Sequence, residues 1–138
     1  MRQNLTDALV WLRYAQEDLA AAVALAGDES VVPRHPAWLA QQAAEKAIKA
    51  ALVAAGRPFP RTHDLDRLVR LLADPSVVLA TGADLSDLTE YAVESRYPGD
   101  LLDEVLVQDA ARAVDDAGKI IAAVGAALGQ SEGGGQDG

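Results

Sequence analysis

The chain has 138 residues, a formal net charge of −9 and no cysteine. This length suits one domain with a core of its own, and the lack of cysteine excludes disulfides and thiolate metal sites. No apolar run reaches the length of a signal peptide or a membrane span, so we expect a soluble cytoplasmic protein. The negative charge argues against a general nucleic-acid binder, because affinity for phosphate comes from Lys and Arg.

The first two segments have the pattern of long amphipathic helices. Apolar residues recur at helical spacing over residues 5–26, with Thr6 as a candidate N-cap and Gly27 as the stop. A second helix follows "VPRHP", where Pro36 suits the first turn, and it ends at Gly56. One face is rich in alanine, which predicts the close approach of another helix. The opposite strip is polar and holds Gln42, Glu45, Lys46 and Lys49.

The second half of the chain predicts three more helices. A short one, residues 65–72, follows "RTHDL", with Thr62 or Asp64 as its cap and Pro75 as its end. A fourth covers residues 85–95 and stops before Tyr97-Pro98, and a fifth covers residues 107–128 with apolar residues at alternating spacings of four and three. The Gly-rich tail, residues 130–138, is predicted to be disordered. The pattern indicates an all-α bundle with one domain over residues 1–129.

Positive charge is concentrated in one stretch of this acidic chain. Residues 34–70 hold seven basic residues against three acidic ones, a net charge of +4, so the remainder carries −13. A local basic zone on an acidic body attracts a phosphate group while the whole molecule avoids polyanions. Ordinary surface charge explains the same distribution equally well.

The loop that follows the second helix reads "RPFPRTHDL" and holds one of the two histidines, His63. One interpretation is a capping segment whose ring bonds to the backbone. The other is a polar group lining a cleft, in which Arg57 and His63, at this spacing, clamp a phosphate and move a proton. Arg96 has two readings as well, as a cation complementing a helix dipole or as an anion ligand beside Tyr97.

The familiar enzyme patterns are absent from the sequence. No Walker or dinucleotide loop occurs, no His-Glu-x-x-His is present, and two histidines without cysteine make a poor zinc set. We therefore predict no metal and no cofactor, with a nucleotide as the candidate ligand.

Three blocks together resemble a known family. The combination of "AQQAAEKAIKAALVAAGRPFPRTHDL", "YAVESRYPGD" and "DAARAVDDAGKII", in this order, is similar to the HEPN domain (higher eukaryotes and prokaryotes nucleotide-binding). The resemblance covers residues 5–128. It implies an up-and-down bundle of about five helices, a homodimer, and a partnership with a small nucleotidyltransferase, in some relatives as a toxin–antitoxin pair.

The resemblance also implies that many relatives are metal-independent ribonucleases. Their signature is an Arg followed after four to six residues by a His near the start of a late helix. No histidine follows Arg96 here, and the one literal match, Arg57 to His63, lies one connection too early. The resemblance therefore predicts a nucleotide-binding or interaction module without catalysis. If the chain is a ribonuclease, the candidate catalytic residues are His63, Arg57 and Arg96, and RNA is its substrate. A purely structural regulatory dimer is the remaining alternative.

These considerations define a candidate anion site at the basic loop. Its ligand would be a nucleotide phosphate. The predicted ligand-binding residues are Lys46, Lys49, Arg61, His63, Asp64, Arg96 and Tyr97. In the competing interpretation, His63, Asp64 and Arg96 join the helices internally, with an Arg96–Asp64 pair and no ligand.

Overall fold

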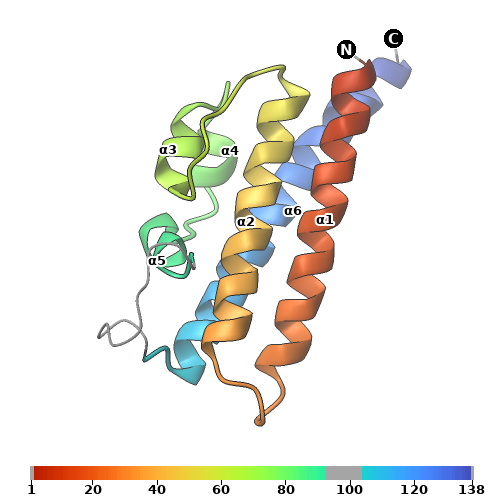
Figure 1. Ribbon diagram of the computed structural model, residues 1–138. Helices are drawn as coiled ribbons and strands as arrows, with labels where there is room; N and C mark the ends of the chain where they lie inside the picture. The colour runs from red at the N-terminus through yellow and green to blue at the C-terminus, as the bar shows by residue number, and fades with distance from the viewer. Residues whose placement is uncertain (1, 93–103, 138) are drawn as a thin grey trace.

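The computed structural model describes residues 2–92 and 104–137, with side chains described as far as Gly129. Six helices and no strand occur in these ranges, which confirms the predicted all-α fold (Figure 1). The helices are α1 (Arg2–Ala26), α2 (Arg34–Ala54), α3 (Leu65–Arg70), α4 (Ser76–Leu79), α5 (Leu85–Glu90) and α6 (Val107–Asp137). None of these helices combines the length and the apolar composition needed to cross a bilayer.

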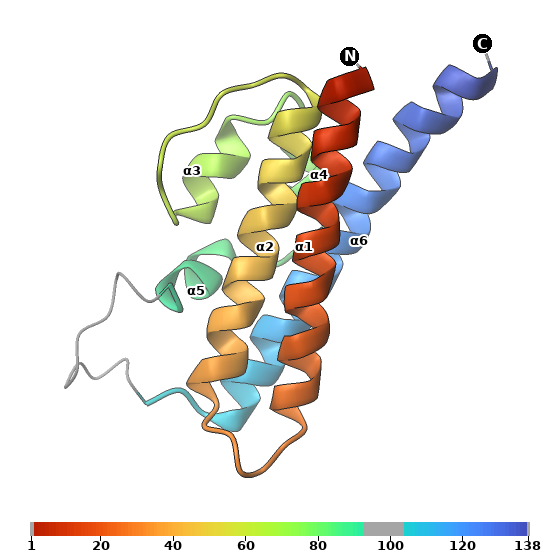
Figure 2. The same ribbon diagram turned by 45° about the vertical axis from the view of Figure 1, so that its right-hand side comes forward.

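The three long helices run up and down beside one another, and α3, α4 and α5 cover one side (Figures 1 and 2). Helix α1 begins and α6 ends at the same end of the bundle, so both termini lie at that end (Figure 1). Helix α2 contacts α1, α6, α3 and α5, which makes it the central helix.

Small side chains allow α2 to hold this central position. Ala43, Ala47 and Ala50 have no exposed surface. Ile48 and Leu52 of the same helix are also fully buried. An alanine removes side-chain volume at the contact and lets two helix axes approach closely, while it costs no side-chain entropy. The predicted alanine-rich contact face is therefore confirmed.

Local signals set the ends of the helices around the candidate site. Gly56 adopts a φ of 67°, a left-handed conformation that glycine adopts without strain. Its N–H donates to the carbonyl of Val53 at 3.0 Å, and the N–H of Arg57 donates to the carbonyl of Leu52 at 2.9 Å. This pair of bonds is the Schellman arrangement, and it turns the chain sharply out of α2. At the start of α3, Asp64 accepts a hydrogen bond from the N–H of Arg67, so Asp64 is the N-cap.

Several helix boundaries differ from the sequence prediction. Helix α1 begins at Arg2, and the predicted cap Thr6 lies inside it, where its hydroxyl donates to the carbonyl of Arg2 at 3.0 Å. Helix α3 ends at Arg70 and α5 ends at Glu90, both earlier than expected. Residues 93–95 of the predicted fourth helix lie outside the described ranges.

Helix α4 was not predicted at all. It has four residues, Ser76–Leu79, and begins directly after Pro75, which was expected only to end the preceding helix. One turn is too short to display a helical period, and two valines favour extended structure, so the pattern gave no signal. At the other end of the chain, α6 continues to Asp137, through the segment expected to be disordered, and the domain limit at residue 129 stays a prediction.

Candidate functional site

The basic loop, residues 57–64, connects α2 to α3, and hydrogen bonds hold both ends of it. Arg57 donates from Nη1 to the carbonyl of Leu71 at 3.1 Å. At the other end, the N–H of Leu65 donates to Oγ1 of Thr89 at 3.1 Å. The loop thus passes from the end of α2 to α3 (Figure 1), and His63 near its far end contacts the polar strip of α2.

Glu45 is the centre of the contact between this loop and α2. Its Oε1 lies 2.7 Å from Nδ1 of His63 and accepts a hydrogen bond from Nε2 of Gln41 at 3.0 Å. Its Oε2 accepts from Nζ of Lys49 at 2.9 Å. Gln41 also donates to the carbonyl of His63 at 3.5 Å. We call Gln41, Glu45, Lys49 and His63 the polar network.

The polar network is buried at its core. Glu45 is 5% exposed and Gln41 has no exposed surface. Burial alone raises the pKa of the Glu45 carboxyl group, but hydrogen bonds from Lys49, His63 and Gln41 outweigh it, so the pKa lies below the ordinary value of 4.5. Glu45 is therefore a buried anion at neutral pH, held by donors from both the helix and the loop.

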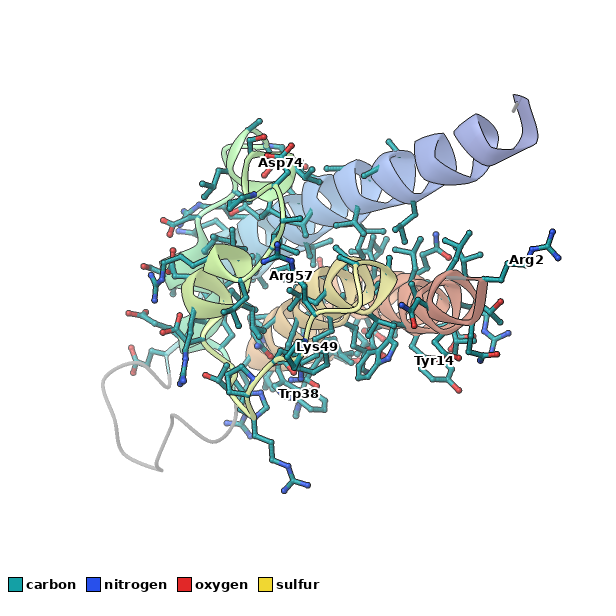
Figure 3. The ribbon with its side chains drawn as sticks, turned by 90° about the horizontal axis from the view of Figure 1, so that it is seen from above. Arg2, Tyr14, Trp38, Lys49, Arg57 and Asp74 are labelled. Carbon is teal, nitrogen blue, oxygen red and sulfur yellow. The ribbon has the colours of Figure 1, made fainter. Side chains whose placement is uncertain are left out.

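Lys49 is surrounded by aromatic rings as well as by its carboxylate. Its Nζ lies 5.8 Å from the ring centroid of Trp11 and 5.4 Å from that of Phe59, and the two rings meet edge to face at 6.3 Å. Its side chain is only 14% exposed. Figure 3 shows Lys49 on the same side of α2 as Trp38. A cation held by a carboxylate and two ring faces is strongly localised in this position.

Lys46, one turn before, points toward α1 instead. Its Nζ lies 2.5 Å from Oδ2 of Asp18, and the two side chains are 29% and 21% exposed. The two lysines predicted to bind the same anion are therefore each paired with a carboxylate of this chain, Lys46 with Asp18 and Lys49 with Glu45.

The other predicted site residues are dispersed. Arg61 is exposed and forms no ion pair with a described residue. Asp64 caps α3, and Arg57, which was predicted to clamp a phosphate together with His63, donates to the Leu71 carbonyl. The remaining two, Arg96 and Tyr97, lie outside the described ranges, and with them the predicted Arg96–Asp64 pair.

Comparison with known proteins decides the family. The family model described as the HEPN domain matches residues 8–127. The chain belongs to the HEPN family. A crystal structure of an archaeal HEPN homologue is similar over 88% of this chain and 97% of that chain, with a TM-score of 0.67 and 23% identity. The predicted resemblance and the HEPN-like bundle are thus confirmed. Among curated proteins no sequence matches.

For this HEPN domain, sequence reasoning missed how the polar strip of α2 is used. We placed Glu45 and Lys49 on a polar strip and Lys49 in an anion site. The spacing of their ion pair was correct, but both side chains are largely buried and contact residues of the basic loop. The reason is that the loop folds back and covers the strip, which a helical period cannot reveal. Phe59, between two prolines, was the available signal, because an aromatic residue in a loop needs an apolar surface to cover.

The chemistry of the polar network in this HEPN domain is that of an oriented imidazole. A buried carboxylate at Nδ1 fixes the ring of His63, as it does in hydrolytic enzymes that use histidine as a base. Among the described residues, no group of three or more His, Asp or Glu side chains is placed to hold a metal ion.

Proposed function

We propose that this HEPN domain is a protein-interaction module that acts as a homodimer beside a small nucleotidyltransferase, in a toxin–antitoxin type of pair. The observation that carries the proposal is the pairing of both candidate lysines within the chain. A nucleotide phosphate would have to take Lys49 from Glu45 and Lys46 from Asp18. Lys49 is the more buried of the two. If it left Glu45, this carboxylate would stay charged and unpaired in a low-dielectric site, so the pairing of Lys49 favours a structural role over phosphate binding.

Helix α6 supports the dimer. Gly118, Ala122, Gly125 and Gly129 follow one another at spacings of four, three and four, so they share one narrow face, which we call the small-residue seam. A Cβ at Gly118 or Gly125 would meet only a leucine of α1, at 3.9 and 3.8 Å, and one at Gly129 would meet nothing within 4 Å. Packing within the described chain therefore does not require these glycines.

Each glycine in a helix interior costs about 0.5–1 kcal/mol relative to alanine. A second copy that approaches the small-residue seam closely gives a reason for this cost. Helix α1 also exposes Leu9, at 39%, and apolar surface of this kind is suited to burial in a dimer.

Two measurements test the proposed function. Light scattering on the purified chain should give twice the chain mass of 14.5 kDa, and co-expression with a small nucleotidyltransferase from a neighbouring gene should yield a stable complex. Ala122→Arg, at an exposed position on the seam, should give a folded monomer, whereas Ala73→Arg, at an exposed position after α3, should remain dimeric. A monomeric wild type that also ignores the nucleotidyltransferase would refute the proposal.

The fixed imidazole of His63 favours a second candidate, a metal-independent endoribonuclease. Its carboxylate contact at 2.7 Å is the kind of geometry that general acid–base catalysis uses. Cleavage of RNA in the presence of a chelator, lost in His63→Ala and reduced in Glu45→Gln, would promote this candidate. The interaction module predicts no cleavage by any of the three proteins.

A further inference from the structure

A cavity of about 190 Å³ opens at the end of the bundle where α1 ends and where α2 and α6 begin. This end is the lower one in Figure 1, opposite to the two termini. We call this feature the end cavity. Its apolar lining consists of Leu25, Ala26, Val31, Pro33, Pro36, Val107 and Ala110. A buried apolar cavity of about 150 Å³ holds a benzene molecule in another protein, so the end cavity has room for one large apolar side chain.

One exposed apolar side chain, Val107, lines this opening, and others are close in sequence to lining residues. Seven large hydrophobic residues are exposed in the described part of the chain, and four of them belong to the segments that frame the end cavity. These are Val23 at 55%, Val32 at 49%, Leu106 at 52% and Val107 at 67%. Single exposed apolar residues are ordinary, but their concentration in the segments that line an open cavity favours a surface for another molecule.

The charge beside the cavity is negative, and no lysine or arginine among the described residues lines it. Helix α1 ends here, with the negative end of its dipole and no basic residue in its last turn. Asp28 and Glu29 follow and line the cavity. Hydrogen bonds from the hydroxyl and the N–H of Ser30 lower the pKa of Asp28, which keeps it ionised. The next cation along the chain, Arg34, does not line the cavity.

We propose that the end cavity docks a segment of a protein partner that presents one large apolar side chain next to a lysine or arginine. The apolar side chain fills the cavity, and the cation lies between Asp28, Glu29 and the last carbonyl groups of α1. An apolar segment without a lysine or arginine would leave these two carboxylates without a cationic partner. The negative charge therefore favours apolar segments that carry a cation over those that do not. This inference rests on the proposed interaction function and names one surface through which it operates.

Two synthetic peptides of equal length, with identical leucines and with either lysines or glutamates beside them, provide the test. Fluorescence polarisation on the full chain should show the lysine peptide binding at least about tenfold more tightly, with the difference reduced by salt. Amide shifts in NMR should concentrate on the cavity lining, at Leu25, Val31 and Ala110.

Matched variants separate local recognition from the overall negative charge. The double variant Asp28→Asn with Glu29→Gln should weaken the binding of the lysine peptide by about tenfold. Glu17→Gln with Asp115→Asn removes the same charge from exposed positions elsewhere and should leave binding unchanged. Val107→Ser, at a largely exposed position, should weaken the binding of both peptides and leave the melting temperature unchanged.

The inference is overturned if the two peptides bind equally, if both double variants weaken binding equally, or if the lysine peptide fails to bind at millimolar concentration. If Val107→Ser converts a dimer into a monomer, the occupant is a second copy, which also overturns it. A wild type that dimerises and holds its nucleotidyltransferase while ignoring the peptides refutes the inference and leaves the proposed function intact.

Discussion

The two faces of α2 are both buried, and they are buried by different means. On the face toward α1 and α6, alanines such as Ala43 and Ala47 leave no exposed surface because little side chain is present. On the face toward the basic loop, Gln41, Glu45 and Lys49 are covered together, and each polar group finds a partner. The first face depends on volume and the second on charge and hydrogen bonding.

This difference determines what each face tolerates. A close-packed alanine face resists added atoms, because its neighbours have no space into which to move. The polar network resists removed charges, because each remaining partner stays in a low-dielectric site. The polar residues of α2 that the sequence suggested as a ligand site thus stabilise the fold. Substitutions at these positions should therefore lower the free energy of unfolding.

The largest effect is expected from Glu45→Ala, which leaves buried Lys49 without its anion. The free energy of unfolding should fall by about 3–5 kcal/mol, measured by chemical denaturation. Glu17→Ala, which removes an exposed carboxylate from α1, is the control and should stay within about 0.5 kcal/mol. A loss below about 1 kcal/mol in Glu45→Ala would mean that the polar network does not hold the basic loop.

On the opposite face, Ala47→Leu tests packing. Ala47 has no exposed surface, so three added carbons must displace a neighbouring helix, and the free energy of unfolding should fall by about 1–3 kcal/mol. Ala24→Leu, at an exposed position of α1, provides the matched addition and should be nearly neutral. Equal tolerance of the two substitutions would show that the alanine face contains unfilled space.

A smaller and pH-dependent effect is expected from Glu45→Gln. The folded-state pKa of Glu45 lies below 4.5, so ionised Glu45 stabilises the fold above that pH, and the contribution is lost as the pH falls through the folded-state pKa. The stability difference between wild type and Glu45→Gln should therefore shrink below pH 4.5. A difference that stays constant down to pH 3 would contradict the assignment.

Asp87 provides a comparison of opposite sign for the same pH series. Burial raises the pKa of the Asp87 carboxyl group above 3.8, and its Oδ2 is buried without a hydrogen-bond partner. The ionised form is therefore disfavoured in the folded state. Asp87→Asn should be at least as stable as wild type at pH 7, and any advantage should disappear as the pH falls through the folded-state pKa of Asp87.

The smallest effect is expected from Lys46→Ala. Its pair with Asp18 is partly exposed, and pairs of this kind contribute below about 1 kcal/mol. Lys49→Ala, one turn later, should cost several times more, because it leaves Glu45 buried without its cation. Thermal melts of the two variants side by side test this ratio, and equal losses would show that burial does not distinguish the two lysines.

The sequence by itself determined the helices and several of their ends. A helical period over many residues identifies a long helix, and the glycine after α2 gave its end correctly because its left-handed conformation is a local property. The Glu45–Lys49 pair was also predictable, since residues four apart on a helix are neighbours. These features depend on interactions within a few residues of chain.

Only the tertiary structure decided which side of α2 is open to solvent. His63 reaches Glu45 across 18 residues of sequence, and Lys49 meets Trp11 from another helix. No local pattern specifies such contacts, because they depend on how the loop and helices fold onto one another. The lysines, histidine and aspartate of the predicted anion site were identified from their residue types, but their partners depend on burial, and burial is a property of the whole fold.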